Sequence, residues 1–453
     1  MNPPKPSARP RRVSLWRYLR LFRQDILSAQ PEHLYRAWMA EFRTPFFRSF
    51  LINDPALLHR VLNERPDDFP KSPRVTEGLR LLLGQSVFVT NGAHWKRQRR
   101  IIDPAFEGGH LRDTFPAMLV AADAAVARLG TVGSGPVEIE GEASHAAADI
   151  IFRTLFSIPI EHRLAKDVFE AFRDHQRSQP ILNLAAFLPL RSWMPRLFRR
   201  EARATARRIR NLIEELTAQR LTEIAAGSAP NDLATKIMTT TDPETGERFD
   251  LAEMVDQVAI FFLAGHETSA SALSWALYLL ATHPEWQDKV AKEAADLGPE
   301  FSSLSSLRIT RDVFREALRL YPPVPMMVRE ASQLEEFRGR KVARGSQIVL
   351  SPWHLHRHER LWSNPDGFDP ARWSTEEGRA SAREAYMPFS SGPRVCTGAG
   401  FAMAEGVVML SKLVGAFSFA PIEGRVPQPV AHLTARAKDG IWLAATPRDS
   451  LRS

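Results

Sequence analysis

The sequence predicts a mostly α-helical protein with a minor β component, an α-rich α+β architecture. Apolar residues recur at helical spacing over two long stretches in the middle of the 453-residue chain, at 199–226 and 251–282. Strand-like patterns occur near the ends, at 46–52 and 341–350. Composition does not change abruptly anywhere, so we expect an N-terminal arm with an amphipathic helix (1–45) followed by one domain (46–453).

The N-terminal arm carries an amphipathic pattern. Its apolar residues recur at helical spacing with arginines between them, at Leu15, Leu19, Phe22 and Ile26. The pattern fits a helix that packs against the body of the protein, and it also fits a helix that lies in a membrane surface. Packing is the favoured alternative, and peripheral membrane contact stays open.

Three further elements have clear boundaries. Asp54 followed by Pro55 is typical of a helix start, with apolar spacing of three to four after it. The helix over 251–282 ends at a His-Pro pair, because proline cannot continue a helix. Residues 341–350 have the pattern of a β-hairpin that turns at Gly345.

The net charge of +8 is compatible with nucleic acid, an anionic membrane or an acidic protein as partner. Basic residues gather at 9–23, 96–100 and 191–210, but none of these stretches carries a nucleic-acid-binding module, so no nucleic-acid partner is expected. No stretch reaches the roughly 18 uninterrupted apolar residues of a membrane span, and the N-terminus lacks a signal-peptide core. We expect a cytoplasmic monomer.

Cys396 is the only cysteine in the sequence. One thiol excludes an intramolecular disulfide, a four-thiolate zinc site and an iron–sulfur cluster held by four cysteines. Gly392 and Gly398 allow close approach of a planar partner, Arg394 favours the thiolate, and an apolar helix follows. These surroundings favour a ligating sulfur over a small buried hydrophobic residue.

The helix over 251–282 is interrupted at residues 264–269. Gly265 costs roughly 1 kcal/mol relative to alanine in a helix interior, and Glu267 is expensive to bury unpaired. One interpretation is a helix locally opened beside Gly265, with Thr268 and Glu267 as a proton-delivery pair. The alternative is that Gly265 permits close helix packing and Glu267 faces solvent.

A charged pair lies in an apolar helix over residues 310–322. Glu316 and Arg319 are three residues apart, so they are neighbours on one face. Their apolar surroundings suggest burial and a further partner. Arg372, in the segment 368–373, is the candidate to complete the network by bidentate contact with Glu316.

Together these motifs resemble the cytochrome P450 monooxygenases. The cysteine loop 389–398, the Glu316 and Arg319 pair, the segment 368–373 and the residues 264–268 occur in the order and approximate spacing of that family. The stretch from Trp95 to Arg99 is similar to the family's motif near the haem propionates. The resemblance runs from about Asn53 to the C-terminus.

The resemblance implies a single haem-thiolate monooxygenase domain with haem b as cofactor. Cys396 would be the axial iron ligand, in a loop that includes Phe389 and Gly398. Other residues would bind the haem propionates: Arg394, Arg99, Trp95 and Arg329. Glu316, Arg319 and Arg372 would support the cysteine loop. Thr397 stands where the family usually has an aliphatic residue, which could change hydrogen bonding around the sulfur.

On the substrate side, the resemblance gives Thr268 the role of orienting and protonating bound dioxygen, and Glu267 that of relaying protons. The pocket residues it implies are Phe261, Phe262, Ala264, Val324 and Met326. The apolar stretch 181–190 and the residues to 198 would form a lid over the substrate channel. Either ordinary helix packing or contact with lipid-like molecules explains this stretch.

The implied reaction inserts one oxygen atom into a C–H or C=C bond of a hydrophobic molecule, with a fatty acid, another lipid, a terpenoid or a carotenoid as the substrate class. Electrons would come from a separate ferredoxin or flavodoxin with its reductase, since the chain shows no flavin or nicotinamide motif. Lys96, Arg97 and Arg100 are either contacts for that partner or simply solvated. A haem-thiolate isomerase, a peroxygenase and a haem sensor are disfavoured by the Glu267 and Thr268 pair.

Overall fold

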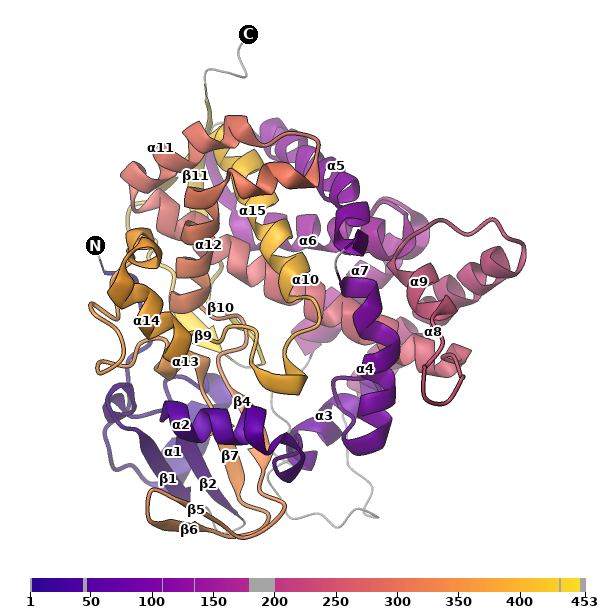
Figure 1. The fold of residues 1–453 in the computed structure, drawn as a ribbon. Coiled ribbons are helices and arrows are strands. Elements are labelled where there is room, and N and C mark those ends of the chain that lie inside the picture. The colour runs from indigo at the N-terminus through magenta and orange to yellow at the C-terminus, as the bar shows by residue number, and fades with distance from the viewer. Residues whose placement is uncertain are drawn as a thin grey trace.

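The computed structural model describes residues 2–43, 47–107, 109–133, 135–178, 200–431 and 433–448. The helices are α1 (Leu15–Gln24), α2 (Pro55–His59), α3 (Pro73–Leu83), α4 (Gly92–Phe106), α5 (Gly109–Val132), α6 (Ile139–Phe156), α7 (Arg163–Ser178), α8 (Arg200–Ala225), α9 (Leu233–Thr239), α10 (Leu251–Ala281), α11 (Pro284–Glu293), α12 (Arg308–Leu320), α13 (Pro352–Leu355), α14 (Glu376–Ala385) and α15 (Ala399–Ala416). Figure 1 shows that helices make up most of the molecule and gather around α10 and α15. The predicted α-rich α+β class is confirmed.

The strands are β1 (Met39–Arg43), β2 (Arg48–Ile52), β3 (Gly135–Glu138), β4 (Met327–Glu330), β5 (Glu335–Phe337), β6 (Arg340–Val342), β7 (Gln347–Leu350), β8 (Phe417–Pro421), β9 (Pro429–Ala431), β10 (Ala435–Ala437) and β11 (Trp442–Pro447). The largest sheet has the order β1-β2-β7-β4, and β2 pairs with β7 in parallel. This sheet lies at the lower edge of the view in Figure 1, away from α11 and α5.

The predicted hairpin over 341–350 is wrong. β6 pairs with β5, and β7 pairs instead with β2 and β4. The turn that makes a hairpin is Arg338-Gly339, where both residues have positive φ (49° and 74°), as a two-residue type I′ turn requires. Gly345 also turns the chain, with φ 81°, but it leads β7 into another sheet.

The long helix α10 forms the centre of the core. It begins with a capping box in which Asp250 and Glu253 each bond the other's backbone amide, and nearly all of its C-terminal half is buried. The helix packs against α6, α8, α12 and α15. The prediction of a helix over 251–282 is therefore confirmed to within one residue, and the prediction over 199–226 corresponds to α8.

The N-terminal arm packs against the body, as favoured from the sequence. Ile26 and Leu27 follow α1 and lie in the main hydrophobic core, and Phe22 is packed against it. The opposite face of α1 is open, with Trp16 84% exposed. In the part of the chain that the structure describes, two other helices, α5 and α15, are long and apolar enough to cross a membrane by length and composition, and both pack against neighbouring helices within the fold.

Candidate active site

Cys396 lies in a loop that enters α15. The Cys396 amide donates to the carbonyl of Phe389 (2.9 Å), and the Ala399 amide donates to the carbonyl of Cys396 (3.3 Å) at the start of the helix. At Gly392 the backbone has φ 71°, and a Cβ atom there would lie 2.0 Å from the Leu62 carbonyl oxygen. The loop therefore packs tightly against the segment after α2, while Cys396 as a residue remains exposed.

The protein environment acts on the sulfur in two opposing ways. Burial among surrounding atoms raises the pKa of the Cys396 thiol, while the Gly398 amide, Arg99 and Lys71 lower it. Arg394 is the residue that the sequence suggested would favour the thiolate. In the structure its guanidinium instead stacks on the Trp95 ring, 4.0 Å from the ring centroid.

Cationic side chains surround the cysteine loop. Arg394 donates to the side chain of Asn91 (2.9 Å), and Arg99 donates to the carbonyl of Val395 (2.8 Å), directly before Cys396. Arg329 is 4% exposed, and burial lowers its pKa to about 10. The pKa of Arg394 is lowered to about 9, chiefly by burial and also by the positive charges of Arg329 and Arg99.

The positive charges around the cysteine loop are not all neutralised by protein groups. Among the residues that the structure describes, the buried Arg329 side chain has no hydrogen-bond acceptor and no carboxylate partner. A buried charge is unfavourable without a counter-charge, so this site calls for an anion. The two propionates of haem would supply such charges, and the residues present therefore fit that cofactor beside the Cys396 thiol.

Lys71 also belongs to this site, and sequence reasoning did not find it. Its Nζ donates to the carbonyl of Phe88 (2.6 Å), and its pKa lies well below the usual value because of burial and of the positive charges of Arg329, Arg394 and Arg99. A bridge between the backbones of Lys71 and Arg329 sets their proximity. No local motif marks this lysine, so only the sheet pairing reveals it.

Thr397 does not contact the sulfur with its hydroxyl. The hydroxyl donates to Asp103 on α4, and the same carboxylate accepts from Arg99 Nε (2.8 Å). The departure from the usual aliphatic residue thus connects the cysteine loop to α4 and to the side chain of Arg99.

On α10, the residues around Gly265 are helical without interruption. The expected local opening is absent. A Cβ atom on Gly265 would lie 2.5 Å from Ile151 Cδ1, so this glycine permits close approach of α6. The Thr268 hydroxyl donates to the carbonyl of Ala264 (2.5 Å), one turn earlier. Glu267 accepts a hydrogen bond from Thr434 (2.5 Å) and does not lie free in solvent.

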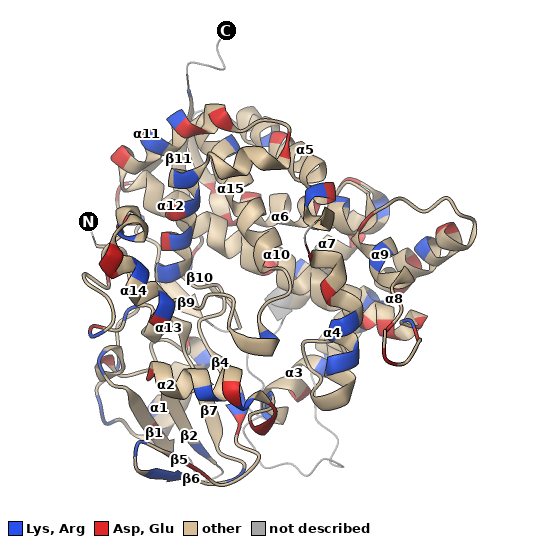
Figure 2. Cartoon of the chain, viewed as in Figure 1, with Lys and Arg blue, Asp and Glu red and all other residues tan. Residues whose placement is uncertain are grey.

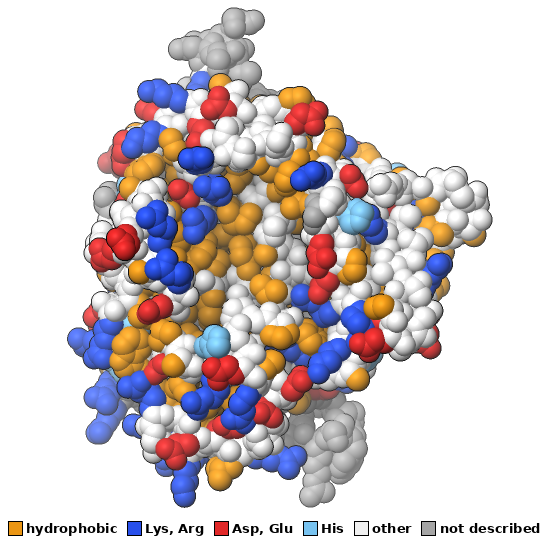
Figure 3. Space-filling model, in the orientation of Figure 1, with side chains coloured by type: hydrophobic (Ala, Val, Ile, Leu, Met, Phe, Trp, Pro, Cys, Tyr) orange, Lys and Arg blue, Asp and Glu red, His pale blue; other side chains and the backbone are white. Residues whose placement is uncertain are grey.

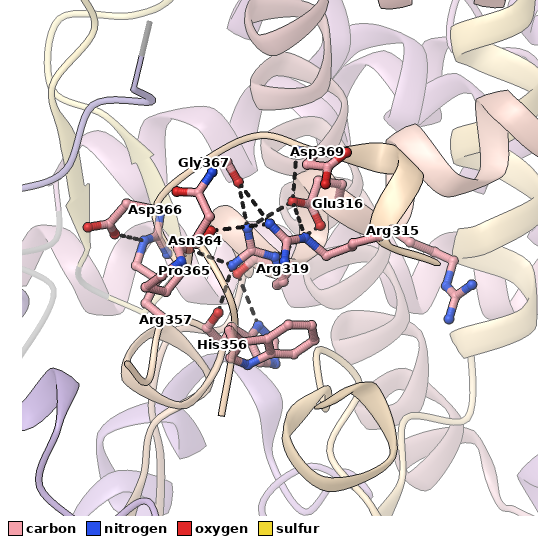
Figure 4. Close-up of polar contacts among 12 residues, drawn as sticks. Arg315, Glu316, Arg319, His356, Arg357, Asn364, Pro365, Asp366, Gly367 and Asp369 are labelled. Atoms are coloured by element: carbon pink, nitrogen blue, oxygen red, sulfur yellow. Dashed lines mark hydrogen bonds and ion pairs between the residues drawn. The ribbon is translucent and has the colours of Figure 1, made fainter. Parts of the chain in front are cut away.

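The structure brings Glu316, Arg319 and Arg372 together. Figure 4 shows the polar contacts of Glu316 and Arg319 with the residues around them. Arg319 forms the bidentate pair, through Nε (2.9 Å) and Nη2 (2.8 Å). Arg372 reaches Glu316 through Nε alone (3.0 Å), so the predicted bidentate contact of Arg372 is wrong. Arg319 also donates to three backbone carbonyls, those of His356, Pro365 and Gly367. This buried network fixes the segment before α14.

The predicted pocket residues separate into two groups. Phe262 is 2% exposed and packs against Phe152 and Phe172, which places it in the core between α6, α7 and α10. Phe261 is half-buried and its ring lies 5.7 Å from that of Phe106. Ala264 is exposed, and two further positions are half-buried, Val324 and Met326. The predicted lid over 181–198 lies outside the described residues.

A lone cysteine at the start of an apolar helix, beside the buried and unpaired Arg329, fits the class of haem-thiolate proteins. The family model described as Cytochrome P450 matches residues 27–443, and the chain belongs to the cytochrome P450 family. The protein is a haem-thiolate monooxygenase, and its cofactor is haem.

Individual relatives agree with this family. The chain is 31% identical to cyclooctat-9-en-7-ol 5-monooxygenase of Streptomyces melanosporofaciens over 91% of this chain and 87% of the relative. It is 30% identical to cytochrome P450 4A14 of Rattus norvegicus over 87% of this chain and 80% of the relative. The crystal structure of the cytochrome P450DA heme domain shares the fold, with a TM-score of 0.81, 24% identity and 98% coverage of both chains.

Proposed function

We propose that Cys396 is the axial ligand of the haem iron and that Arg394, Arg99, Arg329, Trp95 and Lys71 hold the haem propionates. The unpaired buried charge of Arg329 is the observation that carries this assignment. Phe389 and Gly398 shape the loop beside the ligand, since Phe389 accepts the Cys396 amide hydrogen bond and Gly398 precedes α15. The network of Glu316, described above, holds the supporting segment.

When bound, haem supplies dioxygen binding and activation, and a thiolate ligand favours O–O cleavage. The side chains of the protein contribute proton delivery to this chemistry. Thr268 moves a proton at Oγ1, which now donates to the carbonyl of Ala264 and can rotate to another acceptor. Glu267, the neighbouring residue, replaces the proton that Thr268 gives up.

The substrate we propose is a hydrophobic molecule of the terpenoid or fatty-acid type, oxidised at a C–H or C=C bond. Relatives over most of the chain carry the names cyclooctat-9-en-7-ol 5-monooxygenase and cyclooctatin synthase, which points to the terpenoid alternative. Phe261, Ala264, Val324 and Met326 offer apolar contacts. A screen of terpenes and fatty acids for a low-to-high spin shift tests the class, and Ala264→Leu should weaken the shift for bulky compounds. An unchanged spin shift would show that Ala264 does not line the substrate pocket.

The cytochrome P450 family depends on redox partners, and we propose a separate ferredoxin or flavodoxin with its reductase. On the face shown in Figure 3, Lys and Arg side chains surround an apolar hollow, and Figure 2 shows such residues along α4 and α12. On α4, Arg97 and Arg100 already form ion pairs with Glu253 and Asp242. Lys96 pairs with Asp67 where both side chains are exposed (50% and 68%), so this pair can yield to an acidic partner.

We propose a cytoplasmic monomer that touches anionic membranes through α1. The exposed Trp16 lies beside Arg17 and Arg20 along a shallow groove, and the indole and the guanidiniums suit a lipid interface. An unpaired cysteine fits a reducing compartment. Co-sedimentation with phosphatidylserine vesicles should fall on Trp16→Ser, with phosphatidylcholine vesicles as the control. Equal binding of both proteins to phosphatidylserine would contradict the contact.

Thr268→Ala tests the proton-delivery role. Without the hydroxyl, electron use should continue while product per electron pair falls by about tenfold or more. Thr222→Ala is the matched control, because Thr222 also donates to the carbonyl one turn earlier, on α8. Product yield per NADH consumed, measured with a surrogate redox pair, checks the result. Unchanged coupling in Thr268→Ala would overturn the role.

A further inference from the structure

The Glu267 carboxylate is held from the side of the C-terminal strands. Thr434, directly before β10, donates to Glu267 Oε1 (2.5 Å), and Arg436 Nη2 in β10 lies 3.5 Å from the same oxygen. Ser271 donates to the carbonyl of Ala435 and keeps β10 against α10. Glu267 is 16% exposed and Arg436 36% exposed, so the cluster reaches from the core toward the surface.

A second carboxyl group belongs to the same cluster. Glu140, in the first turn of α6, accepts the amide of Ala437 at Oε1 (3.1 Å), and the Ile139 amide donates to Ile441 (2.8 Å). The pKa of Glu140 is raised to about 7, chiefly by burial and also by the negative charges of Glu138 and Glu267. The Ala437 hydrogen bond and Arg436 oppose this rise. Arg436 therefore acts on both carboxyl groups.

The geometry of Arg436 differs from that of a fixed structural arginine. Arg319 donates from all three nitrogens at 2.9 Å or less. Arg436 makes one long contact with Glu267, and its buried Nε has no hydrogen-bond partner among the described residues. A guanidinium held this loosely can follow either carboxylate as the negative charge moves between them.

Resting on the proposed role of Glu267, we propose that Glu140, Arg436 and Thr434 form the proton-entry path that reprotonates Glu267. Glu140 takes one proton from solvent and passes it, across water, to the Glu267 carboxylate that has just protonated Thr268. Arg436 stabilises whichever carboxyl group is ionised, and Thr434 orients Glu267. No electrons move in this step, and Glu140 recovers its proton from bulk water. Arg436 and Thr434 are positioning residues.

The first test follows Glu140 itself, without turnover. In the ferric holoenzyme, the carboxyl C=O stretch of protonated Glu140 should disappear in infrared difference spectra as pH rises through about 7, and Glu140→Gln should lack this band. Arg436→Gln should shift the transition to higher pH, because it removes a positive charge, and Arg436→Lys should restore it. Glu267→Gln should shift it to lower pH. A transition that neither substitution moves would overturn the coupling.

The second test measures product per electron pair against pH. Glu140→Gln should lower coupling by about tenfold near neutral pH and remove the inflection of the wild-type profile, whereas Arg436→Gln should move that inflection to higher pH. Glu142→Gln, which removes an exposed acid from the same helix, is the matched control. If both cluster variants match wild type while Glu267→Gln loses coupling, the entry path is wrong and the role of Glu267 stands. If Glu267→Gln also matches wild type, the role proposed for Glu267 fails.

Discussion

The carbonyl oxygen of Leu62 lies 2.0 Å from the position that a Cβ atom would occupy on Gly392. Gly392 also has φ 71°, a conformation that side chains rarely adopt. Gly398, on the other side of Cys396, has φ −88° and open space around the same position. Backbone conformation and packing against Leu62 therefore both require glycine at position 392, whereas neither requires it at position 398.

Gly392→Ala should destabilise the protein even without haem, by about 1–3 kcal/mol, because the loop must move away from Leu62. Gly398→Ala should leave the unfolding free energy of the haem-free protein unchanged, since no atom of the residues that the structure describes opposes a methyl group there. Urea unfolding of the haem-free proteins measures both. Equal loss in the two variants would contradict the distinction.

The buried network around Glu316 gives a second prediction. Arg319→Met leaves the Glu316 charge and three backbone carbonyls without this donor, so the unfolding free energy should fall by about 3–5 kcal/mol. Arg311→Gln on the same helix is the control, because Arg311 is exposed (45%) and should change stability by less than about 0.5 kcal/mol. Chemical denaturation followed by circular dichroism separates these outcomes, and a small effect of Arg319→Met would show that the network is not needed for stability.

Glu405 on α15 predicts a pH dependence of stability. Its side chain is 3% exposed, accepts from Ser269 (2.6 Å), and burial raises its pKa to about 8. A raised folded-state pKa gives a contribution that is complete below the unfolded value of about 4.5 and is lost as pH rises to about 8. Wild type should therefore lose stability relative to Glu405→Gln over this window, on the order of a few kcal/mol.

Thermal unfolding of both proteins between pH 5 and pH 8.5, at roughly half-unit steps, measures this difference. Glu423→Gln, which changes an exposed acid, serves as the control and should follow wild type throughout. A difference between wild type and Glu405→Gln that does not vary with pH would mean that Glu405 is ionised in the folded protein.

The fold class could be predicted because its signals are local. Helical periodicity is strong in α8 and α10, and a proline ends α10 within one residue of the prediction. The hairpin over 341–350 failed because both Gly339 and Gly345 turn the chain, and the choice between them depends on β2, which is far away in the sequence. The local sequence pattern does not specify which strand will pair with another that lies far away in the sequence.

The residues of the candidate site also fall into those that local sequence could indicate and those that depend on distant contacts. Residues in recognisable motifs, such as Cys396 and Arg394, could be named from the sequence. Lys71 could not, because its place depends on the bridge to Arg329. The contacts of Glu267 with β10 were also hidden, because the side chain of a helix residue gives no indication of which strand will cover it.

The central claim is that Cys396 holds the haem iron as a thiolate. The absorbance spectrum of the dithionite-reduced carbon monoxide complex tests it most directly, with Cys396→Ala as the comparison. We expect the red-shifted Soret band of thiolate ligation in the wild-type protein and its loss in Cys396→Ala. A wild-type protein that binds haem without this band, or a variant that keeps it, would contradict the account.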